Sequence, residues 1–270
     1  MKLCRVQPLE FSIKDVGRSG NEVHAQTFDG IVENGSVLEI RGGFFGPRER
    51  TGRKWAADQV KFLPPVVPSK IVGVGRNYHE HVKEFNNPVP KEPVIFLKPP
   101  SSILAPEDPI VLPVISQRVE YEGEIGIVIG KRCYHLGPGE DVKPYILGYT
   151  ALNDVTARDL QRADLQWIRG KGFDTFCPFG PVVETDHPSA ETRVETRVNG
   201  ETKQSAPIGE MIFPIDFLIR WITQVMTLEP GDVIATGTPG GVGPMVPGDA
   251  VEVSVSNIAT LRNPVAAPQP

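Results

Sequence analysis

Short apolar runs separated by glycine and proline extend along most of the chain, and this pattern predicts many short strands. The 27 Gly and 27 Pro are scattered between the runs and are not massed in one tract. Clusters of β-branched residues predict buried strands at 70–74, 125–129 and 145–152. The Asn-Gly pairs at 34–35 and 199–200 predict hairpin turns, because this pair readily adopts positive φ angles.

Three short helices are also expected. Asn77 and Glu80 have the spacing of a helix-capping pair, and so do Thr156 and Asp159. A third helix begins at Pro214 and carries an apolar stripe, which predicts a face turned towards the core. The residues of this stripe are Phe217, Leu218, Trp221, Ile222 and Val225.

The chain is expected to form two domains, a small N-terminal domain at 1–65 and a main domain at 66–270. The stretch at 62–69 has the proline-rich composition of a connector between them. Many strands with few and short helices indicate a mixed α+β fold that is mainly β.

Composition and charge narrow the range of functions. The net charge of −5 over 270 residues, without any Lys/Arg run, gives no indication of binding to nucleic acid or to an anionic membrane. No apolar run approaches the about 20 residues that span a bilayer. The three cysteines lack metal or redox spacing, which fits a reducing interior and core positions. These features predict a cytoplasmic protein.

The most informative stretch is an acidic segment that continues into an apolar strand. Glu120, Glu122 and Glu124 alternate with other residues and would point to the same face of a strand. The continuation at 125–129 has the composition of a buried strand, so ionised carboxylates there need a counter-charge. A bound divalent cation is the simplest one. An edge strand with a solvated glutamate face is the alternative.

A candidate base lies on the helix expected after Asn77. His81 and Glu84 are three residues apart, so they share one helix face and can hydrogen-bond. A carboxylate that holds one imidazole nitrogen leaves the other free to accept a proton. A solvated polar helix face explains the same residues equally simply.

Four further features have both a functional and a structural interpretation. Asp154 lies at a strand-to-helix junction, where it could serve as a ligand or as a turn residue. Arg158 opposes the helix dipole in the first helical turn, which suggests that it faces an anion, although it could be a surface arginine. Lys171 lies between glycines in an expected loop. The glycine-rich loop at 234–244 lacks the Gly-Lys-Ser/Thr of a phosphate loop, but it could cup a carboxylate or serve as a turn.

Together these pieces resemble the fumarylacetoacetate hydrolase family over about residues 70 to 262. The matching stretches are Gly75-Arg76-Asn77-Tyr78 with His81, then 121–124, 153–159, 171–175 and 236–239. The resemblance implies the family's β-sandwich roll with short helices, here after a small N-terminal domain. It is greatest to the shorter bacterial acylpyruvate hydrolases, oxaloacetate decarboxylases and 2-hydroxyhepta-2,4-diene-1,7-dioate isomerases.

The resemblance also implies roles for single residues. Glu122, Glu124 and Asp154 would be the ligands of Mg²⁺ or Mn²⁺, whereas Glu120 is not carried over as a ligand. The implied catalytic residues are His81, Glu84 and Lys171, and the implied substrate contacts are Arg76, Tyr78, Arg158, Gln161 and Thr238. Arg158 and Gln161 match substrate contacts in only some members of the family.

The function expected from this resemblance is metal-dependent hydrolysis of a C–C bond in acylpyruvate-type 2,4-dioxo acids through a metal-bound enolate. His81, oriented by Glu84, would activate the water. An oxaloacetate-type decarboxylase or a 2-hydroxyhepta-2,4-diene-1,7-dioate isomerase that uses the same site is the alternative. A non-catalytic small-acid binder is disfavoured because it would not need both a metal site and a base. The expected partners are a small 2-oxo or 2-enol acid and a second copy of the chain in a homodimer.

Overall fold

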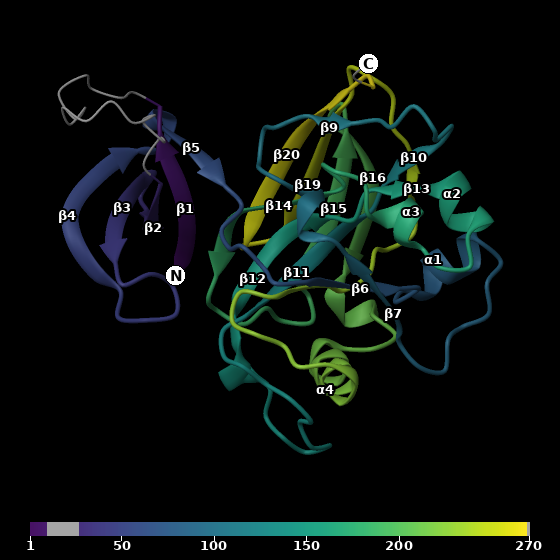
Figure 1. Ribbon diagram of the computed structural model, residues 1–270, viewed down its shortest axis with the longest axis horizontal. Coiled ribbons are helices and arrows are strands. Elements are labelled where there is room, and N and C mark those ends of the chain that lie inside the picture. Colours follow the sequence, from purple (N-terminus) through teal and green to yellow (C-terminus); the bar gives the residue numbers. More distant parts are fainter. Residues whose placement is uncertain (10–26, 269–270) are drawn as a thin grey trace.

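Strands dominate the fold in the computed structural model, which describes residues 1–9 and 27–268 (Figure 1). The strands of the largest sheet are β1 (Lys2–Pro8), β2 (Phe28–Glu33), β3 (Ser36–Arg41), β4 (Glu49–Ala56), β5 (Val60–Leu63), β6 (Ile71–Gly75), β7 (Val94–Lys98), β8 (Ile103–Leu104), β11 (Gly123–Ile129), β12 (Ile146–Asn153), β14 (Cys177–Glu184) and β17 (Val233–Ala235). Their order is β4-β3-β2-β1-β14-β12-β11-β17-β6-β7, with β5 paired to β1 and β8 paired to β14.

Two smaller sheets and four short helices complete the described elements. One sheet, of order β13-β10-β18, contains β10 (Val119–Tyr121), β13 (Thr156–Ala157) and β18 (Gly243–Pro244). The other, of order β16-β15-β19-β20-β9, contains β9 (Ile110–Val111), β15 (Arg193–Val198), β16 (Glu201–Pro207), β19 (Ala250–Val255) and β20 (Ala259–Ala266). The helices are α1 (His79–Glu84), α2 (Arg158–Ala163), α3 (Ile168–Lys171) and α4 (Ile215–Val225).

The main core lies between the large sheet and the five-stranded sheet. Ile125 and Ile127 of β11 pack in one buried cluster with Val253 of β19 and Leu261 of β20. Burying two sheet faces against each other removes apolar area from water on both, at about 25 cal/mol per Å². The expectation of a mainly β sandwich with short helices is therefore confirmed.

The N-terminal strands form a lobe beside the main body, drawn in purple and blue in Figure 1. This lobe has its own small core, which includes Cys4, Val6 and Val37. It is joined to the main body because β1 pairs antiparallel with β14 and thereby extends the large sheet. The domain boundary at residue 65 stays a prediction, and residues 10–26 and 269–270 of the two predicted domains lie outside the described residues.

Most local signals in the sequence correspond to elements of the structure. Both Asn-Gly pairs form hairpin turns, with φ angles of 47° and 72° at Asn34 and Gly35 and of 52° and 82° at Asn199 and Gly200. The three predicted buried strands are present as β6, β11 and β12. All three cysteines are free and buried, and burial raises the pKa of Cys177 to about 12, as expected of core thiols.

The predicted capping pairs are wrong, because tertiary contacts use the same side chains. Asn77 is fully buried and donates to the carbonyl oxygens of Phe213 (3.1 Å) and Thr236 (2.7 Å), so it ties together distant segments and does not cap α1. The Thr156 hydroxyl donates to the carbonyl oxygen of Asp154 (2.9 Å), and neither α1 nor α2 has a side-chain cap.

The buried face of α4 differs from the predicted stripe. Leu218 and Ile222 are buried as expected, but Ile219 is the third apolar residue of that face. Phe217 and Val225 are 39% and 60% exposed, because the neighbouring elements cover a face about one residue further round the helix.

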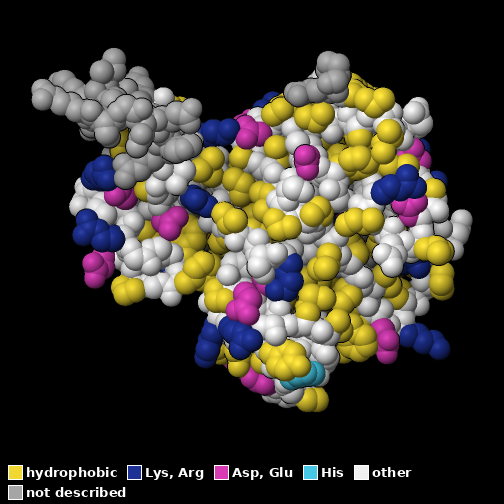
Figure 2. Space-filling model, in the orientation of Figure 1, with side chains coloured by type: hydrophobic (Ala, Val, Ile, Leu, Met, Phe, Trp, Pro, Cys, Tyr) yellow, Lys and Arg dark blue, Asp and Glu magenta, His cyan; other side chains and the backbone are white. Residues whose placement is uncertain are grey.

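None of the described helices combines the length and apolar character required to span a bilayer. On the face drawn in Figure 2, hydrophobic side chains are spread widely and charges of both signs are interspersed.

The sequence Pro-Gly-Asp occurs at two turns, 230–232 and 247–249, which provide a matched test of what anchors the sheet. Asp232 and Asp249 each accept a hydrogen bond of 2.8 Å from the backbone N–H three residues earlier. Asp232 is fully buried and also accepts from Ser69 and Lys70 just before β6, whereas Asp249 is partly exposed and also accepts from the Asn199 side chain (2.8 Å). Only Asp232 therefore joins two parallel strands of the large sheet, β17 and β6.

We expect Asp232→Ala to lower the free energy of unfolding by about 3 to 5 kcal/mol, because it leaves Lys70 without its partner. Asp249→Ala should cost only about 1 to 2 kcal/mol, because it removes two solvent-accessible hydrogen bonds, from the Val246 N–H and the Asn199 side chain. Urea unfolding of both variants beside the parent measures the difference. Equal losses would show that the buried contacts of Asp232 add nothing to the turn itself.

Candidate active site

The acidic segment, predicted as one strand, is two strands that are divided at Glu122. β10 belongs to the three-stranded sheet and β11 to the large sheet, so the chain passes between sheets at this residue. The Glu122 N–H donates to the Asn153 side chain (2.9 Å), and the Asp154 N–H donates to the Glu122 carbonyl oxygen (2.8 Å). These contacts bring Asp154, at the end of β12, beside the two glutamates.

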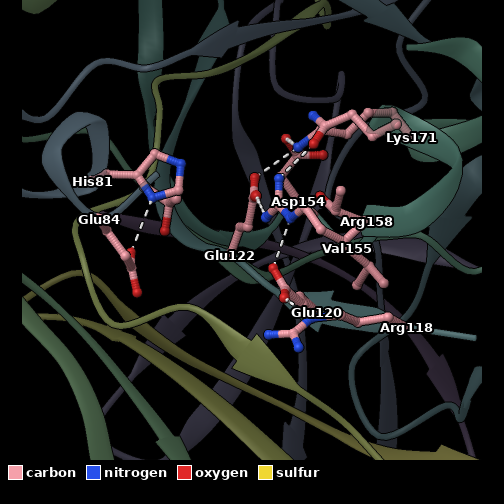
Figure 3. A network of polar contacts seen from close by, with 12 residues as sticks. His81, Glu84, Arg118, Glu120, Glu122, Asp154, Val155, Arg158 and Lys171 are labelled. Carbon is pink, nitrogen blue, oxygen red and sulfur yellow. Dashed lines mark hydrogen bonds and ion pairs between the residues drawn. The ribbon is translucent and has the colours of Figure 1, made fainter. Parts of the chain in front are cut away.

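Glu122, Glu124 and Asp154 form a buried cluster of carboxylates. One oxygen from each lies within 4.8 Å of the others, and none of the three residues is more than 4% exposed. Oxygen ligands at this spacing suit a hard divalent cation such as Mg²⁺ or Mn²⁺. Figure 3 shows Glu122 and Asp154 converging from neighbouring chain segments.

Two buried lysines hold this cluster in place. Lys171 donates from Nζ to Glu122 (2.6 Å) and also to Asp154. Lys98 donates to the other oxygen of Asp154 (2.6 Å) and to the carbonyl oxygen of Lys171 (2.6 Å). Lys98 therefore fixes both a candidate ligand and the backbone that carries the second lysine.

Arg158 contacts anions, as its unfavourable place in the first turn of α2 suggested, and these anions are two glutamates of the acidic segment. Its Nε donates to Glu120 (2.7 Å) and a terminal nitrogen donates to Glu122. Arg118 binds the second oxygen of Glu120. Glu120 is thus buried but has both oxygens engaged by arginines, away from the cluster of the other three carboxylates (Figure 3).

The charges of the cluster are only partly balanced by side chains. Burial raises the pKa of Glu122, but the positive charges of Lys171 and Arg158 outweigh burial and hold this pKa well below its usual range. Burial and then the negative charge of Asp154 raise the pKa of Glu124 well above its usual range. Among the described residues, one group donates a hydrogen bond to its carboxylate, the Gly237 N–H (2.8 Å). A divalent cation would supply the positive counter-charge that the Glu124 carboxylate lacks. The three residues therefore fit a metal ion both in charge and in the type of ligand atom.

The loop at 234–244, which was expected either to cup a carboxylate or to serve as a turn, contacts a carboxylate of the protein itself. Gly237, with φ of 101°, donates its N–H to Glu124. A Cβ atom at this position would lie 2.6 Å from Asn77, so only glycine fits this close approach. The Thr238 hydroxyl donates to the carbonyl oxygen of Gly123 (2.9 Å) and accepts from Gln204 (2.8 Å), which fixes the loop against β11.

His81 and Glu84 lie on α1, across the site from the carboxylate cluster (Figure 3). His81 is 7% exposed, and its Nδ1 lies 3.5 Å from a Glu84 oxygen, longer than a hydrogen bond. Within the described part of the chain this Nδ1 has no hydrogen-bond partner. The spacing that predicted a dyad therefore places the two groups face to face, and such pairs often tighten only when substrate is bound.

A cavity of about 470 Å³ separates α1 from the carboxylate cluster. Eight of the predicted site residues line it, namely Arg76, His81, Glu122, Glu124, Arg158, Gln161, Lys171 and Thr238. Tyr78 does not, because its ring packs in the main core, where burial raises the pKa of its hydroxyl. Its placement gives no support for a substrate contact. Asp154 and Glu84 are not among the lining residues, but Asp154 binds Lys171 and Glu84 lies 3.5 Å from His81, and both of these partners line the cavity.

The family assignment rests on both sequence and structure. The profile described as fumarylacetoacetate (FAA) hydrolase C-terminal matches residues 70–266, which is more than half of the chain. The chain belongs to the fumarylacetoacetate hydrolase family. A second profile, described as Rv2993c-like, N-terminal, matches residues 25–65.

Relatives with this family domain share close to half of their residues with the chain. "Protein Rv2993c" of Mycobacterium tuberculosis is 47% identical over 85% of this chain and 88% of its own length. "Oxaloacetate tautomerase FAHD2A, mitochondrial" of Homo sapiens is 46% identical over 77% of this chain and 70% of its own length.

Solved structures of the family superpose over nearly the whole chain. The 5-carboxymethyl-2-hydroxymuconate delta-isomerase of Mycobacterium smegmatis is 40% identical, with a TM-score of 0.87 over 99% of this chain and 100% of its own. The fumarylacetoacetate hydrolase of Exiguobacterium antarcticum is 35% identical, with a TM-score of 0.82 over 99% of each chain. This chain is thus a fumarylacetoacetate hydrolase family enzyme.

Sequence reasoning missed Lys98 and misplaced Lys171. A signal for Lys98 existed, since a lysine ends the otherwise apolar strand Val94–Lys98 and a strand lysine of this kind is often paired in the interior. Lys171 was expected in a loop but ends α3 and is 2% exposed. Helix α3 is too short to be predicted from its sequence.

The cluster geometry predicts which glutamates determine metal affinity. We expect Glu124→Gln to weaken Mn²⁺ binding by about 100-fold or more. Loss of a metal ligand costs at least as much affinity as loss of a residue that hydrogen-bonds to a ligand. Glu120→Gln should change the affinity less than about threefold, since its oxygens face arginines. Isothermal titration calorimetry with Mn²⁺ measures both. Equal weakening would place Glu120 among the ligands, and no weakening by Glu124→Gln would place the metal elsewhere.

Proposed function

We propose that this enzyme catalyses proton transfer between the enol and keto forms of a small 2-oxo acid. The observation that carries the proposal is one histidine, His81, facing a cation-rich carboxylate cluster across a single cavity. Such an arrangement offers one group that exchanges protons and, opposite it, positive charges for an oxyanion.

The comparisons support proton transfer over the hydrolysis expected from the sequence. The human relative at 46% identity is named as an oxaloacetate tautomerase. Two of the matched structures at 40% identity are named as isomerases, of 5-carboxymethyl-2-hydroxymuconate and of 2-hydroxyhepta-2,4-diene-1,7-dioate. Both reaction classes move a proton without breaking the carbon chain.

In the proposed reaction the chain's own residues hold the substrate and move one proton. Lys171 and Arg158 attract the carboxylate and the C2 oxygen, and they stabilise negative charge on that oxygen when the enol O–H loses its proton. His81 takes the enol O–H proton on Nε2 and delivers the same proton to C3, with Glu84 behind Nδ1 to hold the ring. A Mg²⁺ or Mn²⁺ ion held by Glu122, Glu124 and Asp154 would supply Lewis-acid charge beside the same oxygens.

Hydrolysis of an acylpyruvate is the second candidate, and the His81–Glu84 pair favours it. A base oriented by a carboxylate can activate water for attack on a carbonyl carbon. A matched structure at 35% identity carries the name fumarylacetoacetate hydrolase. We rank this reaction second because three matches at higher identity, one relative and two solved structures, are named for proton transfers.

Other expectations belong to the same proposal. These are the homodimer, the choice between Mg²⁺ and Mn²⁺, the cytoplasmic location, and the absence of nucleic-acid and membrane partners. The carboxylate donors favour Mg²⁺ or Mn²⁺ over softer ions that select sulfur or imidazole ligands.

The enol of oxaloacetate tests the proposal directly. With Mn²⁺ present, the protein should accelerate its ketonisation, followed by loss of enol absorbance, above the rate with metal alone. His81→Asn should lower kcat by about 100-fold or more, the usual contribution of a general acid or base. The exposed neighbour on the same helix gives the control, because His79→Asn should keep the parent rate.

A second assay separates the two candidates. Parent protein with Mn²⁺ is incubated with acetylpyruvate and fumarylpyruvate, and the release of pyruvate is measured. Turnover of these substrates without any acceleration of enol oxaloacetate would replace our first candidate by the second. Loss of Mn²⁺ affinity in His81→Asn, matching its loss of activity, would remove His81 as the proton carrier.

A further inference from the structure

Two arginines line the same cavity without an ionic partner. Arg76 follows β6 and Arg162 lies in α2, and both line the cavity that contains His81 and the carboxylate cluster. Neither guanidinium makes a hydrogen bond or an ion pair within residues 1–9 and 27–268. We call these two residues the arginine pair.

The other two cations that line this cavity are already paired with carboxylates of the protein. Arg158 and Lys171 are both bound to Glu122. Of the two other acidic residues of the lining, Asp164 is bound by Arg169 through Nε at 2.7 Å, and Glu124 accepts from the Gly237 N–H at 2.8 Å. The arginine pair therefore carries positive charge that no carboxylate of the described residues neutralises, whereas each inner cation is shared with a carboxylate of the protein.

The guanidinium group of each arginine lies over the ring of an aromatic residue. The guanidinium carbon of Arg76 lies 6.0 Å from the centre of the Trp167 ring, and that of Arg162 lies 5.6 Å from the centre of Phe85. Phe85 also carries Arg158 at 4.9 Å and contacts the His81 ring. Stacking leaves the edge of a guanidinium, where its N–H groups lie, free to bind an anion.

The backbone at Arg76 is a second sign of function. Its φ angle is +60°, a left-handed conformation that is uncommon for a residue other than glycine. The buried hydrogen bonds of the next residue, Asn77, hold the chain in this conformation. Strain of this kind is concentrated at ligand sites, where surrounding structure fixes the side chain's direction. The alternative, an ordinary solvated arginine, explains exposed Arg162 alone but not both residues on one cavity.

We propose that the arginine pair binds a second carboxylate, so that the enzyme selects dicarboxylic 2-oxo acids over monocarboxylic ones. The inference rests on the proposed function for the other end of the substrate, where the C1 carboxylate and C2 oxygen lie at the carboxylate cluster. The distal carboxylate then accepts hydrogen bonds from Arg76 and Arg162, whose planar N–H edges match its two oxygens.

Two stable ligands that differ only at the distal end test this subsite. 2-Oxoglutarate and 2-oxopentanoate share the 2-oxo acid end, but one ends in a carboxylate and the other in a methyl group. Calorimetry in the presence of Mn²⁺ should show that the parent binds the diacid about tenfold or more tightly. Arg162→Gln should remove most of this preference while leaving 2-oxopentanoate affinity unchanged, and Arg162→Lys should restore part of it.

Arg132→Gln is the control for net charge, because Arg132 is exposed and pairs with Glu229 away from the cavity lining. It should keep the parent's selectivity. Arg76→Gln should act like Arg162→Gln. Because Arg76 has a positive φ angle, the folding of the Arg76→Gln variant is checked by its unfolding midpoint. If Arg76→Gln does not fold, Arg162→Gln alone decides the test.

The outcomes separate this inference from the proposed function. A parent without preference for the diacid, or an Arg162→Gln variant that weakens both ligands equally, would overturn the subsite. Diacid preference that Arg162→Gln abolishes, in a protein that ketonises no enol acid, would uphold the subsite and reject the proposed reaction. If Arg162→Gln ketonises enol oxaloacetate with the parent's KM, the proposed reaction is upheld and the subsite is rejected.

Discussion

The compensation of buried negative charge is the interaction on which this site depends. Four carboxylates, those of Glu120, Glu122, Glu124 and Asp154, are almost fully buried, and each isolated charge there would cost several kcal/mol. Lys171 and Arg158 each bind two of these carboxylates and Lys98 binds Asp154, so removal of Lys171 or Arg158 takes a partner from two buried anions at once. Glu124 receives the least compensation, which is why the cluster suits an added divalent cation.

The sheet arrangement makes this concentration of charge possible. The chain leaves the three-stranded sheet at Tyr121 and enters the large sheet at Gly123, and Glu122 lies between the two strands. Strand β12 ends at Asn153, whose side chain holds this break, so Asp154 arrives at the same point. The core between two packed sheets gives the carboxylates a fixed position, which a loop alone would not provide.

The cavity has two electrostatic regions. Its inner end contains paired charges and the candidate metal ligands, whereas its arginine pair has no ionic partner among the described residues. Phe85 connects these regions to α1, because it contacts His81 and lies beneath Arg158 and Arg162. Arg162 of the arginine pair and the His81 ring therefore both contact the same aromatic ring.

Residues whose role depends on local spacing could be predicted from the sequence. The hairpins at Asn34 and Asn199, the buried strands, the facing of His81 and Glu84, and the anionic partner of Arg158 all follow from spacing and conformational preference. The helix caps, the buried face of α4, the core position of Tyr78, the role of Lys98 and the convergence of Arg76 with Arg162 were decided only by tertiary structure. Each of these depends on contacts between segments far apart in the chain, and a residue's sequence neighbours carry no information about which distant group will compete for its side chain.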